Sequence, residues 1–315
     1  MHVTLRQLQI FRAIALSGST TAAAQSVPLS QSAASAALNE LERILNARLF
    51  DRVGKRLLLN DEGRALLPTA LAVLDGARNL ETAFLGADHA AHVDLHLFAS
   101  TTIGNYILPR LLARFRDLVP AAQLQLQIGN TRDVVTAVRE FAADLGLIEG
   151  PCHASDIVVV PWLEDELVIV ASPMHPLAKA AKRGKLTAKQ LSRSCWLLRE
   201  PGSGTRETVE QALLPHLVNV ESTMTLGSSE SIKNAVAEGL GVSCLSRYVV
   251  QDLAAAGRLS VLDTRLPRLT RRLTIIHHRR KLLSDSLSGF IAHCRAQTQW
   301  LGGESERFAP LPPSR

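Results

Sequence analysis

Apolar residues recur at helical spacing through the first fifty residues of the chain. In residues 4–17 they fall near every third or fourth position, which predicts an amphipathic helix capped by Thr4. Residues 19–50 predict two further helices, separated where Pro28 cannot continue the preceding helix and biases Val27 away from helical angles. This pattern indicates a helix-turn-helix.

The second helix of this pair is apolar at one end and small and polar at the other. Its large apolar residues lie in 38–45, whereas residues 30–35 are serine, glutamine and alanine. Ser30 is a natural N-cap, because its hydroxyl can accept a hydrogen bond from a free amide in the first turn. A slim polar tip suits insertion into the major groove of DNA, although an ordinary helical hairpin has the same pattern. The residues predicted to face the groove are Ser30, Gln31, Ser32 and Ser35.

Two short extended runs follow, with a basic turn between them. Gly54-Lys55 separates residues 48–53 from residues 56–60, which is typical of a small hairpin, or wing, beside a helix-turn-helix. Basic side chains there would hold phosphates and fix the register of the helix without reading sequence. They are Arg48, Arg52, Lys55 and Arg56.

A long apolar-periodic helix is predicted from Asp61 to Phe84, with Asp61 and Glu62 at the positive end of its dipole. Its apolar face is larger than a lone linker would leave in water. We therefore expect it to pack antiparallel against the same helix of a second chain. Packing against its own chain is the alternative.

The rest of the chain alternates strands with helices. After a polar hinge at 86–91, the pattern predicts a parallel α/β sheet, with strands at 93–99, 124–128 and 144–148 and helices at 103–118 and 131–142. A second set of strands follows at 156–160, 166–171, 195–198, 224–226 and 242–245, with helices from 203 and over 229–238. The chain then returns through 259–262 and 272–277 to a closing helix at 284–298. This order predicts two lobes joined by crossing strands.

Residues 5–68 resemble, without a gap, the N-terminal domain of LysR-type transcriptional regulators. The matching motifs are Ser30-Gln31-Ser32-Ala33-Ala34-Ser35, Leu41-Glu42, Leu49-Phe50-Asp51-Arg52 and Asn60-Asp61-Glu62-Gly63, in the family's order and spacing. Where the family often has basic residues after the second serine of the first motif, this chain has Ala36 and Asn39. The departure leaves the operator sequence open, and Asn39 is expected to read adenine if it reaches the floor of the groove.

The resemblance implies an α/β architecture for the whole chain. It comprises a winged helix-turn-helix DNA-binding domain at 1–60, a linker and dimerisation helix at 61–85, and an effector-binding domain of the type 2 periplasmic-binding-protein fold at 86–302. Lobe I is expected at 91–160 and 268–300, lobe II at 161–267, and a disordered tail at 303–315. The implied partners are double-stranded DNA, RNA polymerase, and further copies of the chain in a homodimer or homotetramer. A small-molecule co-inducer is expected rather than a cofactor.

Three loops that begin predicted helices are rich in hydroxyl groups: residues 100–102, 129–131 and 200–206. If they faced one cleft, their free amides and hydroxyls would cradle a small anion, although plain N-capping explains each loop taken singly. The motif REPGSGTRE resembles a branch of the family that regulates carbon-fixation and sulfur-oxyanion genes, which implies a small anionic effector such as sulfite, sulfate or a phosphorylated metabolite. Glu149 ends a predicted strand at this cleft, or else lies on the surface. The expected effector contacts are Ser100, Thr101, Thr102, Asn130, Thr131, Glu149, Ser203, Gly204 and Thr205.

Composition bears on the partners of the protein and on its cellular location. The formal net charge of +6 is compatible with a polyanionic partner but does not require one. The N-terminal residues lack the apolar core of a signal peptide, and no apolar run reaches transmembrane length. The four cysteines are dispersed, which favours a reducing compartment. We therefore expect a cytoplasmic protein without a membrane partner.

The sequence lacks the local signatures of common enzymes and metal sites. GxSxG, HExxH, the P-loop pattern and GxGxxG are absent, so neither a catalytic nor a metal site is expected. His277-His278, beside Arg279-Arg280-Lys281, is interpreted as a strand end with a solvated face. A solute-binding or enzymatic α/β protein with a helical N-terminal interaction domain is the alternative function.

Overall fold

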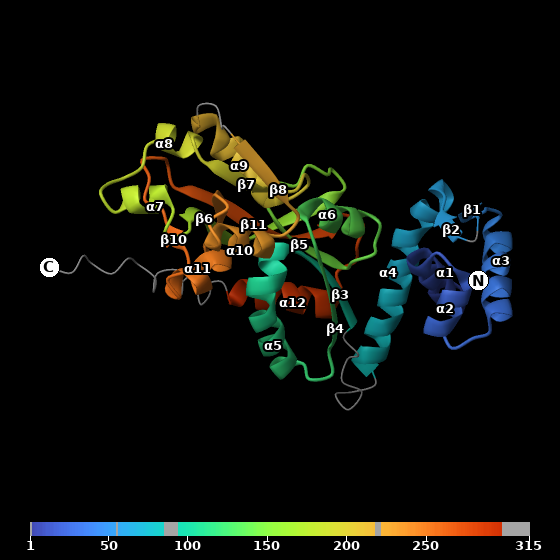
Figure 1. The fold of residues 1–315 in the computed structure, drawn as a ribbon. Coiled ribbons are helices and arrows are strands. Elements are labelled where there is room, and N and C mark those ends of the chain that lie inside the picture. The colour runs from blue at the N-terminus through green and yellow to red at the C-terminus, as the bar shows by residue number, and fades with distance from the viewer. Residues whose placement is uncertain (1, 55, 85–93, 218–221, 298–315) are drawn as a thin grey trace.

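A computed structural model describes residues 2–54, 56–84, 94–217 and 222–297. It has an N-terminal helical domain, a long helix and a larger α/β domain, in that order along the molecule (Figure 1). The predicted hinge at 86–91 and the predicted tail at 303–315 lie outside the described residues. Among those described, no helix is both long and apolar enough to cross a membrane.

The N-terminal domain follows the sequence pattern closely. Its elements are α1 (Leu5–Ser17), α2 (Thr20–Ser26), α3 (Gln31–Leu45), β1 (Phe50–Val53) and β2 (Arg56–Leu59). Thr4 caps α1 and Ser30 caps α3, whose Ala33 amide donates to the Ser30 hydroxyl at 3.2 Å. Gly54 has a φ of +62°, as the turn of the wing requires. The predicted helix-turn-helix and wing are therefore confirmed as structural elements.

The motif at residues 60–63 fixes the wing to the start of α4 (Asp61–Phe84). The Asn60 side chain donates to the carbonyl oxygen of Arg48 at 2.9 Å and accepts from the amide of Gly63 at 2.9 Å. A Cβ on Gly63 would lie 2.1 Å from the Leu49 carbonyl oxygen, so only glycine permits this approach.

Helix α4 packs one face on its own chain. Leu67, Ala70, Leu71 and Leu74 are buried in the core of the N-terminal domain, as the alternative interpretation held for this part of the helix. Val73 and Leu80 remain 45% and 62% exposed. The helix thus keeps apolar surface for a second chain, and antiparallel pairing stays a prediction.

The α/β domain is built on one mixed sheet with the strand order β4-β3-β5-β11-β6-β9-β7-β8. In β3 (Asp94–Ser100), β4 (Gln123–Gly129) and β5 (Leu145–Glu149) the strands are parallel, as predicted. Two long antiparallel strands, β6 (Ile157–Ala171) and β11 (Leu269–His278), run from this part of the sheet to β7 (Cys195–Arg199), β8 (Ser222–Leu226) and β9 (Val242–Ser246). The short strand β10 (Ser260–Val261) pairs with β6.

The prediction of separate strands at 156–160 and 166–171 was wrong. Both belong to β6, which continues through Pro161 and three acidic residues, where β11 pairs with it across a bulge at Leu273 and Thr274. The bulge accommodates Pro161, which has no N–H for the ladder. Because both long strands cross between the lobes, the sheet is mixed rather than parallel.

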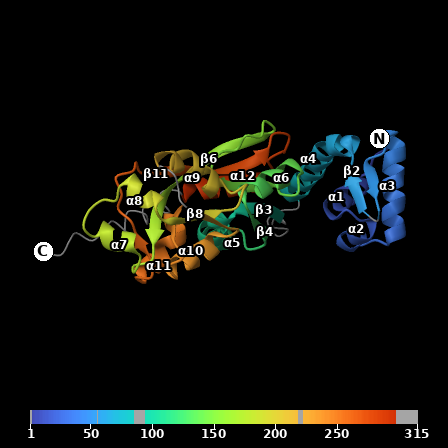
Figure 2. The ribbon, with the colours of Figure 1, turned by 45° about the horizontal axis from the view of Figure 1, so that its top comes forward.

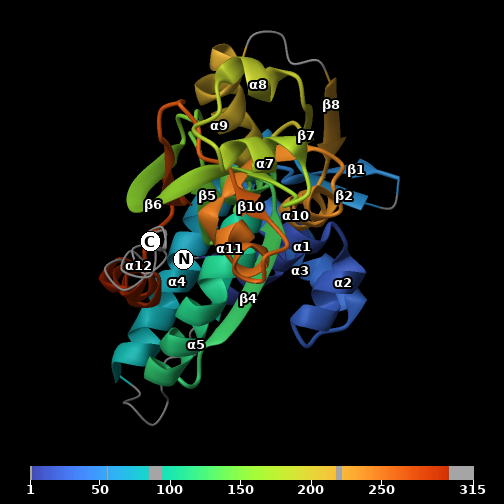
Figure 3. The same ribbon diagram turned by 60° about the vertical axis from the view of Figure 1, so that its left-hand side comes forward.

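Helices cover the sheet as two separate lobes, each with its own apolar cores. Lobe I carries a π-helical turn (Ile103–Ile107), α5 (Leu108–Leu118), α6 (Thr131–Arg139) and α12 (Asp285–Ala296), with α5 and α12 in contact (Figures 1 and 3). Lobe II carries α7 (Pro176–Ala181), α8 (Ala188–Ser192), α9 (Gly204–Ala212), a 3₁₀ turn (Leu214–His216), α10 (Ser229–Ala237) and α11 (Arg247–Ala255). The hydrophobic pattern of the sequence did not predict α7, α8 or α11. Helix α4 lies between lobe I and the N-terminal domain (Figures 1 and 2).

Candidate functional sites: the tip of α3 and the junction of the lobes

The opening of α3 is a row of exposed polar side chains. Ser30, Gln31 and Ser32 are exposed and Ser35 is half-buried. The side-chain amide of Gln31 donates to the hydroxyls of Thr20 and Ser35, at 3.3 Å each. These bonds hold the Gln31 side chain against the helix. These groups keep hydrogen-bonding capacity at a narrow surface, as contact with base edges requires.

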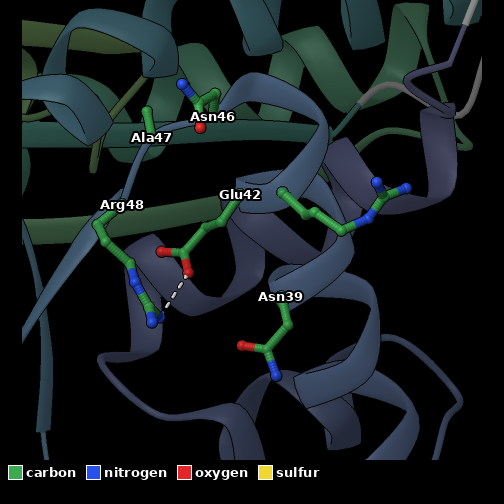
Figure 4. Close-up of a pocket in the computed structure, with 6 residues that line it drawn as sticks. Asn39, Glu42, Asn46, Ala47 and Arg48 are labelled. Atoms are coloured by element: carbon green, nitrogen blue, oxygen red, sulfur yellow. Dashed lines mark hydrogen bonds and ion pairs between the residues drawn. The ribbon is translucent and has the colours of Figure 1, made fainter.

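A hollow of about 440 Å³ lies beside the far end of α3, lined by Asn39, Glu42 and Arg48 among others (Figure 4). The Arg48 guanidinium donates to Glu42 at 3.1 Å, and the buried Glu42 carboxylate also accepts from the Leu49 amide at 2.8 Å. Arg48, predicted only as a phosphate contact, therefore also steadies the turn into the wing. Its side chain is 81% exposed and still accessible to DNA. Arg52 and Arg56 are exposed on the wing, and Lys55 lies outside the described residues.

The three hydroxyl-rich loops meet where the two lobes touch. Thr131 of lobe I donates its hydroxyl to the Glu149 carbonyl oxygen at 2.9 Å and accepts from the Gly204 amide of lobe II at 3.2 Å. A Cβ on Gly204 would lie 1.7 Å from the Glu149 carbonyl oxygen. Glycine is thus required for lobe II to approach lobe I this closely.

At the centre of the junction lies Arg271 of β11, whose side chain is only 2% exposed. It forms ion pairs with Glu149 and, at 2.8 Å, with Asp165, and donates to the hydroxyl of Thr205 at 2.8 Å. Thr102 accepts from the same guanidinium at 3.4 Å. Glu149 is therefore a buried partner of Arg271 and not a surface residue, and the pattern reading missed Arg271 altogether.

Two buried carboxylates share this one arginine. Burial raises the pKa of Asp165 and the charge of Glu149 raises it further, whereas Arg271 and a hydrogen bond from Ser246 oppose the shift. The formal charge of Arg271 with Glu149 and Asp165 is −1 when both acids are ionised. This half of the junction therefore offers no surplus positive charge.

Arg199 of β7 is the second buried arginine of the junction. Its guanidinium donates to the hydroxyls of Thr101 and Ser229, at 2.8 Å each, so it links lobe II to lobe I. Its carboxylate partner is Glu200, the next residue, at 2.7 Å, whose side chain is 23% exposed against 1% for Arg199. Both carboxylate oxygens of Glu200 accept from the Arg199 guanidinium, at 2.7 and 2.8 Å, so the cation is fixed at the junction as half of a neutral pair.

Capping uses two of the predicted effector contacts. Asn130 caps α6 by accepting from the Asp133 amide at 3.0 Å, and Ser203 caps α9 by accepting from the Arg206 amide at 3.4 Å. For these two side chains the structure therefore shows the N-capping role that was the alternative to effector binding. Ser100 differs, because its fully buried hydroxyl has no hydrogen-bond partner among the described residues.

Comparison with known proteins agrees with this architecture. Residues 5–64 match the family described as bacterial regulatory helix-turn-helix protein, lysR family, and residues 91–299 match the LysR substrate binding domain. The chain is 52% identical over 294 residues to the uncharacterized HTH-type transcriptional regulator YeiE of Escherichia coli K12, covering 93% of this chain and 98% of that protein. It is 30% identical to the RuBisCO operon transcriptional regulator of Allochromatium vinosum, covering 92% and 95%.

One solved structure is similar to the α/β domain alone. The regulatory domain of CcmR from Synechocystis PCC6803, solved in complex with 2-PG, superposes with a TM-score of 0.60 at 30% identity, covering 65% of this chain and 97% of that one. The family and its regulatory domains thus account for both parts of the molecule, and the relatives are regulators, not enzymes. The chain belongs to the LysR-type transcriptional regulators, DNA-binding proteins whose activity a small ligand of the C-terminal domain switches.

Proposed function

We propose that the switching ligand is a small anion that binds at the junction of the lobes, on the side of Arg199. The observation that carries this proposal is the Ser100 hydroxyl, which is fully buried and has no partner among the described residues. A buried polar group without a partner is costly, so a ligand oxygen that accepted its hydrogen bond would be favoured. Arg199, held by Thr101 of the same loop, would supply the cationic N–H donors, and its pair with Glu200 is neutral where the Arg271 cluster is negative.

The two halves of the junction would then recognise different parts of the ligand. Arg199 and residues 100–102 would hold the anionic group, with Asn130, Thr131, Ser203, Gly204 and Thr205 around it. Glu149 and Asp165, already paired with Arg271, would repel a second negative charge and accept from a hydroxyl. This division favours a ligand with one anionic end and a hydroxyl group at the other.

At the other end of the molecule, we propose that Ser30, Gln31, Ser32, Ser35 and Asn39 read base edges while Arg48, Arg52, Lys55 and Arg56 hold phosphates. The exposed Val73 and Leu80 of α4 would pair two chains, so that two heads meet a two-fold symmetric site. Assembly into a tetramer, contact with RNA polymerase and a cytoplasmic location complete the proposed function.

A thermal-shift screen of the full chain with sulfite, sulfate, phosphoenolpyruvate and 2-PG tests the anion. A ligand at a hundred times its Kd stabilises the folded state by about 2.7 kcal/mol, which is readily seen as a rise in melting temperature. Ser100→Ala should reduce the rise, whereas Ser288→Ala, at an exposed serine of α12, should leave it unchanged. Equal shifts in wild type and Ser100→Ala would remove Ser100 from the site.

A further inference from the structure

A buried ion cluster joins the linker helix to lobe I. The Lys281 ammonium lies 3.1 Å from the Asp75 carboxylate of α4 and 2.9 Å from the Asp144 carboxylate of lobe I. The side chain of Lys281 is 5% exposed and those of Asp75 and Asp144 are 12% and 18% exposed. As predicted, the strand ends at His278, and Arg279 and Arg280 are exposed. The predicted solvated face is wrong for His277, His278 and Lys281, whose side chains are buried.

An aromatic contact lies at the same boundary. Phe141, which follows α6, has a φ of +57° and packs against the core that α1, α3 and α4 share. Its ring lies 4.3 Å from the ring of His278, centroid to centroid. A bulky residue in the left-handed region is strained, so this placement persists only because its surroundings hold it. The linker helix α4 therefore touches the α/β domain, called the sensor domain below, through both a charged and an apolar contact.

The same two strands connect this boundary to the junction of the lobes. Asp144 immediately precedes β5 and Glu149 ends it, while Arg271 and Lys281 lie on and just after β11. The two strands pair antiparallel, with Leu273 opposite Glu149 and Ile276 opposite Gly146. Arg271–Glu149 thus ties the strands together at the lobe junction, and Lys281–Asp144 ties them at the linker helix.

Both ends of this strand pair are firmly held. The Asp144 carboxylate accepts from the His96 amide at 3.0 Å, and the Lys281 amide donates to the His278 carbonyl oxygen at 2.9 Å. A paired ladder of this kind moves as a unit, because sliding one strand would break its hydrogen bonds and both ion pairs. A displacement at Arg271 would consequently reach Lys281 and, through it, Asp75.

We propose that Lys281 is the positioning residue through which the sensor domain holds the linker helix, and that its bond to Asp75 transmits the state of the lobe junction to the DNA-binding heads. Because coupling is reciprocal, binding of DNA must also alter the strand pair β5–β11. This role of Lys281 rests on the family's DNA binding and is the same whichever effector binds at the lobe junction.

Hydrogen–deuterium exchange on the full chain, with and without a duplex selected for binding from random sequence, tests this coupling. In wild type we expect DNA to change exchange in residues 145–149 and 269–278 by about fivefold, the low end of coupling between linked sites. Asp75→Asn should abolish that distant change while leaving the Kd for the duplex within about threefold, since Asp75 lies outside the DNA-reading surface. An undiminished distant change in Asp75→Asn would overturn the proposal.

Asp144→Asn is the matched control, because it removes the other carboxylate from the same ammonium but leaves the linker contact. It should keep the distant change, and an equal loss in both variants would reduce the cluster to a merely structural role. Lys281→Arg, which preserves the cation, should behave as wild type, whereas Lys281→Met should lose the distant change. If Lys281→Met melts too early to assay, the Asp75→Asn and Lys281→Arg results still decide the matter.

Discussion

The tip of α3 and the junction of the lobes both present hydroxyl groups, but in opposite environments. At the tip, Ser30 and Ser32 are exposed and come from one continuous segment. At the junction, Ser100, Thr102 and Thr205 are buried and come from loops more than a hundred residues apart, around two arginines. An exposed site gains its energy when a partner arrives, whereas a buried site must satisfy its charges in the absence of the ligand.

The two sites therefore differ in what they require of the fold: the tip of α3 requires local helix geometry, and the lobe junction requires compensated charges. The tip needs only a capped helix and a correct turn, so single substitutions there should alter DNA binding without unfolding the chain. The junction stores opposite charges in low dielectric, so removal of one member leaves its partners uncompensated. Substitutions at the tip should therefore change DNA affinity, and substitutions at the junction should change the stability of the fold.

The largest expected effect is from Arg271→Met, which would leave Glu149 and Asp165 buried without their cation. Breaking a buried ion pair in this way typically costs about 3–5 kcal/mol. Urea unfolding of the α/β domain should show a corresponding fall in midpoint. Arg272→Met, the exposed neighbour on the same strand, is the matched control and should change the midpoint little. Similar midpoints for the two variants would show that the junction charges are solvated rather than buried.

At the tip, Ser35→Asp should weaken operator binding by about a hundredfold or more, because it places a negative charge against the DNA. Gel-shift titration at fixed salt measures the change, and the melting temperature should stay near that of wild type. Ser155→Asp adds the same charge to an exposed loop of the sensor domain and should leave affinity unaltered. Unchanged binding by Ser35→Asp would remove α3 from the groove.

Much of the tip was predictable because its determinants are local. Ser30, Pro28 and Gly54 act within a few residues of themselves, through capping, a missing N–H and a left-handed turn. For the lobe junction, the sequence predicted the three hydroxyl-rich loops but not the buried arginine between them. Arg271 binds Asp165, 106 residues earlier, and no local rule brings the two together.

One signal of Arg271 was nevertheless present in the sequence. Along β11, Leu269, Arg271 and Leu273 alternate with Thr270 and Arg272, and the inward positions are the buried ones. A charged residue on the apolar side of a strand is unusual and indicates a buried partner. The continuity of β6 was hidden for a related reason, because Pro161 and the acidic run after it resemble a loop unless the crossing partner is known.

A smaller effect is expected where the wing meets the start of the linker helix. Gly63→Ala would place a Cβ 2.1 Å from the Leu49 carbonyl oxygen, and overpacking of this kind usually costs about 1–3 kcal/mol. Because Gly63 orients the wing, DNA affinity should fall together with the melting temperature, unlike the result for Ser35→Asp. Gly289→Ala in α12, where a Cβ meets nothing within 4 Å, serves as control and should not destabilise. A normal melting temperature for Gly63→Ala would mean that α4 can shift without loss.

Acidification should give the smallest effect, through loss of the Lys281–Asp144 ion pair. Burial would raise the pKa of Asp144, but the charge and hydrogen bond of Lys281, with the His96 amide, hold that pKa below its ordinary value of 3.8. A lowered carboxyl pKa contributes stability that is present above pH 3.8 and is lost as the pH falls through the folded-state pKa. The melting temperature of wild type should therefore exceed that of Asp144→Asn at pH 6, and the gap should narrow below pH 4. Asp117→Asn, at an exposed carboxylate, is the control and should show no such narrowing. A difference in melting temperature between wild type and Asp144→Asn that stayed constant with pH would mean that the Lys281 pair stabilises the chain by packing and not by charge.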